Sequence, residues 1–130
     1  MDKKQVTNSY LKKSEENYKL YEFLTKQSES ESFIEWQAVS IFYSSLCYVK
    51  AYLYSKPNMP EDALNSHVGI KKWLLLETNA KRHMIYEKYY NFLYNYSRDA
   101  RYKCNKITKP VIAKMLEKHN LIKKYLKVTR

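Results

Sequence analysis

The sequence has very little glycine or proline, with one Gly and three Pro among 130 residues. β-Hairpins need Gly, Asn-Gly or Asp-Gly at their tight turns, and neither dipeptide occurs. Glycine-rich phosphate loops, which need more than one Gly, are excluded for the same reason. The chain is therefore predicted to be all-α, and no cofactor is predicted.

Cysteine and long apolar runs are also scarce. Cys47 and Cys104 form neither a disulfide framework nor a paired metal motif, and each is expected to behave as a small apolar residue. The first ten residues lack the apolar run of a signal peptide. The most apolar region, 39–54, is interrupted by serines and by Lys50 and is too short to span a bilayer. These absences predict a cytoplasmic protein with no membrane segment and no metal site.

Apolar side chains are abundant enough to form a core, at 45% of the sequence. Their spacings of three and four predict a single domain over residues 1–130, a compact antiparallel bundle of four to five helices. The expected helices span about 9–26, 32–56, 66–79 and 82–102, and a last one follows a cap at Thr108. Ser32 and Glu35 have the spacing of a capping box. The second helix is expected at the centre of the bundle, because Phe42 and Cys47 widen its main apolar stripe. That stripe is made of Trp36, Val39, Tyr43, Leu46, Val49 and Leu53.

Charge is distributed unevenly along the chain, whose net charge is +11. Residues 1–35 hold six Lys and seven acids, a net of −1, and residues 36–65 are neutral. Residues 66–130 hold sixteen Lys and Arg against four acids, a net of +12. So localised a charge repels itself unless an anionic partner relieves it, and nucleic acid is the usual partner. The alternative is a lysine-rich surface that serves solubility.

Two places in this basic half are candidates for anion binding. Arg98 and Arg101 are three residues apart, hence on one helical face, and can hold one phosphate from two directions. The alternative is that they interact with the helix dipole. His67 follows Ser66 at a helix start, where backbone amides can hold an anion or orient the imidazole. The remaining two histidines, which lie near lysines, are expected to be polar surface residues: His83 and His119.

Three segments, in this order, resemble the HEPN superfamily of helical nucleotide- and RNA-binding domains. They are the apolar run from Trp36 to Leu53, the helix start Ser66-His67, and the Ser-Arg-x-Ala-Arg-Tyr segment from Ser97 to Tyr102. The resemblance covers about residues 33–103. It implies a bundle that dimerises, in which two subunits of many members build a metal-independent ribonuclease cleft. Such proteins are often toxins, or partners of small nucleotidyltransferases, in prokaryotic defence and toxin–antitoxin systems.

The chain departs from the ribonuclease members at one point. They carry an Arg followed, after four to six residues, by a His. At that distance from Arg98 the chain has Lys103, Cys104 and Asn105, and a lysine does not readily exchange protons at neutral pH. The catalytic pair of an endoribonuclease is therefore incomplete.

The resemblance implies an RNA- or nucleotide-binding protein with a phosphate on Arg98 and Arg101. His67 and Tyr102 are the expected proton-handling or orienting groups. The alternative is a non-catalytic helical subunit that pairs with a nucleotidyltransferase-like or other partner protein.

Overall fold

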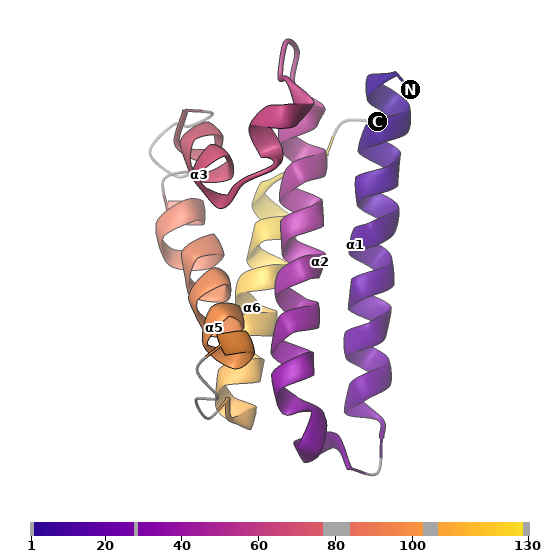
Figure 1. Ribbon diagram of the computed structural model, residues 1–130, viewed down its shortest axis with the longest axis vertical. Coiled ribbons are helices and arrows are strands. Elements are labelled where there is room, and N and C mark those ends of the chain that lie inside the picture. The colour runs from indigo at the N-terminus through magenta and orange to yellow at the C-terminus, as the bar shows by residue number, and fades with distance from the viewer. Residues whose placement is uncertain (1, 28, 77–83, 103–106, 129–130) are drawn as a thin grey trace.

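The computed structural model describes residues 2–27, 29–76, 84–102 and 107–128, and every regular element among them is helical. The predicted all-α fold is confirmed. The α-helices in this part of the chain (Figure 1) are α1 (Lys3–Thr25), α2 (Ile34–Tyr54), α3 (His67–Leu76), α5 (Asn91–Tyr102) and α6 (Lys109–Tyr125). Two 3-10 turns, η1 (Ser30–Phe33) and η2 (Glu61–Leu64), and one π-helical turn, η3 (Ile85–Tyr90), complete the set. None of the described helices is long and apolar enough to cross a membrane.

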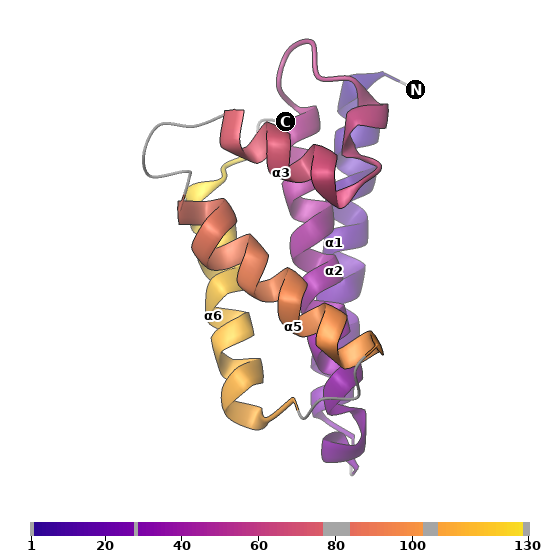
Figure 2. The same ribbon diagram turned by 60° about the vertical axis from the view of Figure 1, so that its left-hand side comes forward.

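The long helices run alternately up and down the molecule. α1 and α2 form an antiparallel hairpin, and α6 lies behind α5 and α2 (Figure 1). α5 crosses α2 at an incline (Figure 2). α3 lies across the end of the bundle at which α2 ends, rather than along it (Figure 2). The candidate site lies at this end, in a cavity lined by residues of α2, α3 and α5.

The first helix begins at Lys3, six residues before the predicted start. Asp2 Oδ1 accepts a hydrogen bond from the Gln5 backbone N–H at 2.8 Å, and Gln5 Oε1 accepts one from the Asp2 N–H at 3.0 Å. This capping box satisfies two otherwise unpaired amides. The added turn places Lys3 Nζ 2.9–3.1 Å from three backbone carbonyl oxygens. They belong to Tyr54, the last residue of α2, and to Lys56 and Met59, which follow it. The start of α1 therefore caps the end of α2.

The predicted capping box at Ser32 and Glu35 is wrong. Ser32 lies inside η1, where its backbone N–H bonds to the Glu29 carbonyl at 2.9 Å. The N-cap of α2 is Phe33, which makes no side-chain capping bond. A capping side chain needs an extended backbone at the cap, and the 3-10 turn does not provide one.

The core stripe predicted for α2 is only partly correct. Val39, Val49 and Leu53 are buried, whereas Trp36 is 62% exposed. As its wide apolar circumference indicated, α2 is covered on several sides, but small residues occupy many of its buried positions. Ser44 is one of these small buried residues. Its hydroxyl donates to the Ser14 carbonyl at 2.8 Å, and the Ser14 hydroxyl donates to the Ser44 carbonyl at 2.7 Å. The close approach of α1 and α2 thus depends on serines, which hydropathy does not mark as core.

The last helix begins as predicted, with Thr108 Oγ1 accepting from the Val111 N–H at 3.4 Å. Its inward face differs at one predicted surface residue, because His119 is 1% exposed. His119 Nδ1 lies 2.6 Å from Ser45 Oγ, and its ring stacks on Tyr18 with centroids 5.4 Å apart. The expectation of a surface histidine was wrong, since a buried hydrogen-bond partner on another helix satisfies the ring. His83 and Cys104 lie outside the described residues.

Candidate functional site

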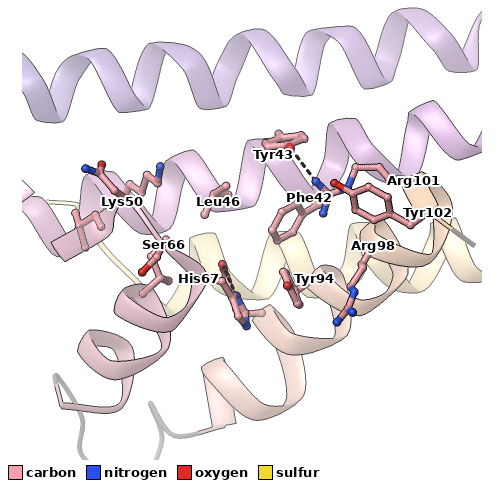
Figure 3. Close-up of a pocket in the computed structure, with 14 residues that line it drawn as sticks. Phe42, Tyr43, Leu46, Lys50, Ser66, His67, Tyr94, Arg98, Arg101 and Tyr102 are labelled. Atoms are coloured by element: carbon pink, nitrogen blue, oxygen red, sulfur yellow. Dashed lines mark hydrogen bonds between the residues drawn. The ribbon is translucent and has the colours of Figure 1, made fainter. Parts of the chain in front are cut away.

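A cavity of about 390 Å³ opens between α2, α3 and α5 (Figure 3). This volume suits a small ligand. All four residues singled out in the sequence line it, although they come from two helices: His67, Arg98, Arg101 and Tyr102. Their roles remain predictions, but the fold places them around one space.

The start of α3 positions His67 at this cavity. Ser66 Oγ accepts a hydrogen bond from the Gly69 N–H at 3.0 Å, so Ser66 caps the helix. Gly69 is the sole glycine of the chain, and a Cβ at this position would overlap the backbone carbonyl oxygen of Ala63. The missing side chain therefore lets α3 approach η2 closely enough to bring His67 to the cavity.

The imidazole of His67 lies against a row of tyrosine rings. Its centroid is 3.7 Å from that of Tyr94, with the rings 9° from parallel. The centroid of Tyr90 is at 5.5 Å and that of Tyr86 at 6.4 Å. His67 Nδ1 lies 3.4 Å from the Tyr90 hydroxyl, at the long end of hydrogen-bond distance. These rings fix the plane of the imidazole.

The π-helical turn accounts for the alignment of these tyrosines, which are four residues apart. In an α-helix of about 3.6 residues per turn, a four-residue step overshoots a full turn. In the wider π-helical turn, which takes more residues, the same four-residue step is less than a full turn. Because the step from Tyr86 to Tyr90 lies in η3 and the step from Tyr90 to Tyr94 lies mainly in α5, the two deviations offset. The rings of Tyr86, Tyr90 and Tyr94 therefore all lie on the helix face that is turned toward His67.

The surroundings keep His67 neutral. Partial burial lowers the pKa of its imidazole below the ordinary 6.5, and the positive charges of Lys71 and Arg98 lower it further. Burial, with the neighbouring Tyr86 and Tyr94, raises the pKa of the Tyr90 phenol. At neutral pH the site therefore contains an imidazole able to accept a proton and a phenol that retains its own.

The two arginines, both near the C-terminal end of α5, are held differently. Arg101 Nη1 donates to the Tyr43 hydroxyl at 3.1 Å and its Nε donates to the Ser97 carbonyl at 3.3 Å. Its guanidinium also lies over the ring of Tyr102, 5.2 Å from the centroid. The side chain of Arg98 extends instead toward the side of His67 and Tyr94 (Figure 3). Arg101 is thus held in place before any ligand binds, while the exposed Arg98 is free to move toward one.

Two residues of α2 contribute to the site without having been predicted from the sequence. Tyr43 was assigned to the core, but it is half-buried and holds Arg101. Lys50 also lines the cavity. A signal for Lys50 was present, because it is the only charged residue between positions 36 and 55. An isolated charge in an apolar helix calls for a specific environment.

The lining residues of the cavity include no Asp or Glu. Across the described part of the chain, no three His, Cys, Asp or Glu side chains gather as metal ligands would. The chemistry of the cavity therefore comes from one imidazole, three cations and several aromatic rings. Such a set binds anions with aromatic groups.

Comparison of the chain with protein-family models, curated proteins and solved structures finds no match. The resemblance to the HEPN superfamily therefore depends on the motif residues themselves and on their order in the chain.

Proposed function

We propose that the protein is a HEPN-like, cytoplasmic RNA- or nucleotide-binding protein whose ligand occupies the cavity between α2, α3 and α5. One observation carries the proposal: His67, Arg98 and Arg101 line the same cavity. Guanidinium groups bind phosphate through oriented, charge-assisted hydrogen bonds. Aromatic rings stack on unpaired bases, as in many proteins that bind single-stranded RNA.

The charge of the whole chain supports the same ligand class. The net charge of +12 in residues 66–130 attracts a polyanion over a longer range than the cavity does. The lysines supply diffuse, salt-sensitive attraction, and the arginines supply a defined contact. These two contributions are separable by experiment.

The test compares two double variants that remove the same formal charge. Arg98→Gln with Arg101→Gln removes the cavity guanidiniums, while Lys114→Gln with Lys124→Gln removes exposed lysines of α6, which does not line the cavity. Affinity for a short single-stranded RNA is measured by fluorescence anisotropy across a salt series. We expect the arginine variant to lose at least about tenfold at every salt concentration, because a charged hydrogen bond contributes about 1.5–3 kcal/mol.

The lysine variant should lose affinity mainly at low salt, where long-range attraction is unscreened. Circular dichroism must show both variants folded, since Arg101 also bonds to Tyr43. Equal losses for the two variants would mean a diffuse basic surface and no site. No RNA binding by the unmodified protein would favour the non-catalytic alternative, a subunit that pairs with a nucleotidyltransferase-like or other protein.

Metal-independent RNA cleavage is a second candidate function, and it is favoured by the neutral imidazole beside Arg98. In this reaction the ribose 2′-oxygen gives its proton to His67 and attacks the adjacent phosphorus, and the bond to the 5′-oxygen breaks as that oxygen takes up a proton from solvent water. The products carry a 2′,3′-cyclic phosphate and a 5′-hydroxyl. Arg98 stabilises the charge that develops on the phosphate, and Tyr102 stands at the rim, 73% exposed.

Cleavage is tested with His67→Gln in the presence of a chelator. We expect the unmodified protein to cut RNA with EDTA present and the variant to lose at least about 100-fold in rate, the usual contribution of a general base. Because the pKa of His67 is lowered, the rate should rise with pH and reach its plateau with a midpoint below 6.5. RNA binding without cleavage would leave the binding function and remove the enzymatic one.

The biological setting that the resemblance implies is a prokaryotic defence or toxin–antitoxin system, in which the protein acts as a homodimer. The structure offers apolar surface for a protein partner, because several large apolar side chains are exposed. Leu20 is 46% exposed, Phe23 59% and Trp36 62%. Exposed aromatic residues are typical of interfaces.

A further inference from the structure

The cavity carries three positive charges at two separate ends. Arg98 and Arg101 lie toward the C-terminal end of α5, and Arg101 is bonded to Tyr43 of α2. Lys50 lies at the opposite end (Figure 3). Residues 43 and 50 are two helical turns apart, about 10 Å at roughly 1.5 Å per residue. The cations are therefore spread along the cavity rather than gathered around one point.

Nothing acidic in the described structure neutralises Lys50. No carboxylate lines the cavity, and the contact of Lys50 Nζ is with the ring of Tyr10, 5.9 Å from its centroid. That distance is at the outer limit for a cation–π contact. Lys50 is half-buried as a residue, and its ammonium, with so weak a partner, is available to an anionic ligand.

The space between the two charged ends is aromatic. Phe42 and Tyr94 lie there with His67, and the Phe42 ring contacts that of Tyr94 at 5.8 Å. A ligand that matches this pattern has a flat or apolar centre and an anionic group on each side of it. A nucleoside with phosphate on only one side would satisfy one end and leave the other unpaired.

We infer that the cavity accommodates a nucleotide with phosphates on both its 3′ and 5′ sides, that is, an internal residue of an RNA strand or a free nucleoside 3′,5′-bisphosphate. Lys50 binds one phosphate, the arginines bind the other, and the nucleoside lies against His67 and Tyr94. This inference rests on the proposed function and specifies its ligand class. It makes Lys50 a specificity-determining residue.

The experiment uses three probes that differ in where their phosphates lie: adenosine 3′,5′-bisphosphate, ADP and AMP. Binding to the full chain is measured by calorimetry at a salt concentration that screens long-range attraction. The bisphosphate should bind at least about tenfold more tightly than AMP and more tightly than ADP, whose two phosphates lie on one side. Lys50→Gln should lower affinity for the bisphosphate to near that for AMP and change the affinity for AMP much less, because AMP can place its one phosphate on the arginines.

Two control variants keep the result interpretable. Lys50→Arg retains the charge and should retain the preference, which shows that the loss in Lys50→Gln is not a folding defect. Lys19→Gln, on an exposed position of α1 that does not line the cavity, should leave all three affinities unchanged. If AMP binds as tightly as the bisphosphate, or ADP does, the two-phosphate inference is wrong while the proposed function stands. If none of the three probes binds and RNA does not bind either, both are wrong.

Discussion

At the scale of single residues, the degree of burial gives two histidines different roles. His67 is half-buried at a cavity and stacks on Tyr94, so it remains accessible to a ligand. His119 is enclosed between α1, α2 and α6, with Ser45 as its hydrogen-bond partner. Burial lowers the pKa of both rings, but only His67 lines the cavity. His119 is a structural residue of the core.

The buried His119 predicts that stability falls in mild acid. Burial, with a contribution from Lys123, lowers the pKa of His119 to about 4, against 6.5 in an unfolded chain. Between these two values the unfolded chain binds a proton that the folded chain does not, so the free energy of unfolding decreases as pH falls through this range. At about 1.36 kcal/mol per unit, the loss from pH 7.5 to pH 5 is on the order of 2 kcal/mol.

Urea unfolding at several pH values measures this loss, and His119→Gln is the matched variant. Glutamine retains a hydrogen-bonding group toward Ser45 but does not titrate, so the variant should lose most of the pH dependence above pH 5. His67, which is less buried, contributes a smaller loss of the same sign. An unchanged pH dependence in His119→Gln would show that His119 is not the group responsible.

At the scale of elements, α3 places His67, and its position depends on one glycine. Helix propensity alone predicts that Gly69→Ala stabilises the protein by up to about 1 kcal/mol. Packing predicts the opposite, because the new Cβ would overlap the Ala63 carbonyl oxygen, a backbone atom that cannot move independently of η2. Overpacking of this kind costs about 1–3 kcal/mol.

We therefore expect Gly69→Ala to destabilise the protein in urea unfolding and to weaken RNA binding by displacing His67. The control is Val68→Ala in the same turn of α3. Val68 is 74% exposed, so its truncation should change stability by less than about 0.5 kcal/mol. A stabilised Gly69→Ala variant would mean that α3 is not held against η2 as described.

At the scale of the whole molecule, the bundle leaves large apolar side chains in solvent while concentrating positive charge in one half of the chain. The sequence holds 14 tyrosines, and exposed side chains such as Phe23 and Trp36 add to the aromatic surface. A second subunit that covers part of this surface gains hydrophobic free energy. The positive charge opposes such association unless an anion is bound.

Light scattering at micromolar concentration should accordingly give about twice the monomer mass of 15.7 kDa. Phe23→Ser with Trp36→Ser should shift the protein toward monomer with little change in unfolding free energy, because both side chains are exposed already. A monomeric unmodified protein would contradict the dimer that the HEPN resemblance implies. RNA added to the protein should favour the dimer by neutralising charge.

The sequence by itself determined the features that depend on neighbours within a turn or two of the chain. Scarce glycine excluded hairpins, and Thr108 marked the start of α6. Asn65 and Ser66 were the two candidate caps of α3, and Ser66 is the cap. Arg98 and Arg101 could be placed on one helix face for the same reason. These signals are local, since a cap or a helical spacing acts over three or four residues.

Only the tertiary structure decided which side chains meet across helices. It placed His67 of α3 and Arg98 of α5 on one cavity, added Lys50 of α2 to the same cavity, and enclosed His119. It also left Trp36, in the first turn of α2, in solvent, and it placed small serines at the close contact of α2 with α1. Burial depends on residues distant in sequence, and hydropathy along a nearly uniformly apolar helix does not tell which of its sides faces which neighbour.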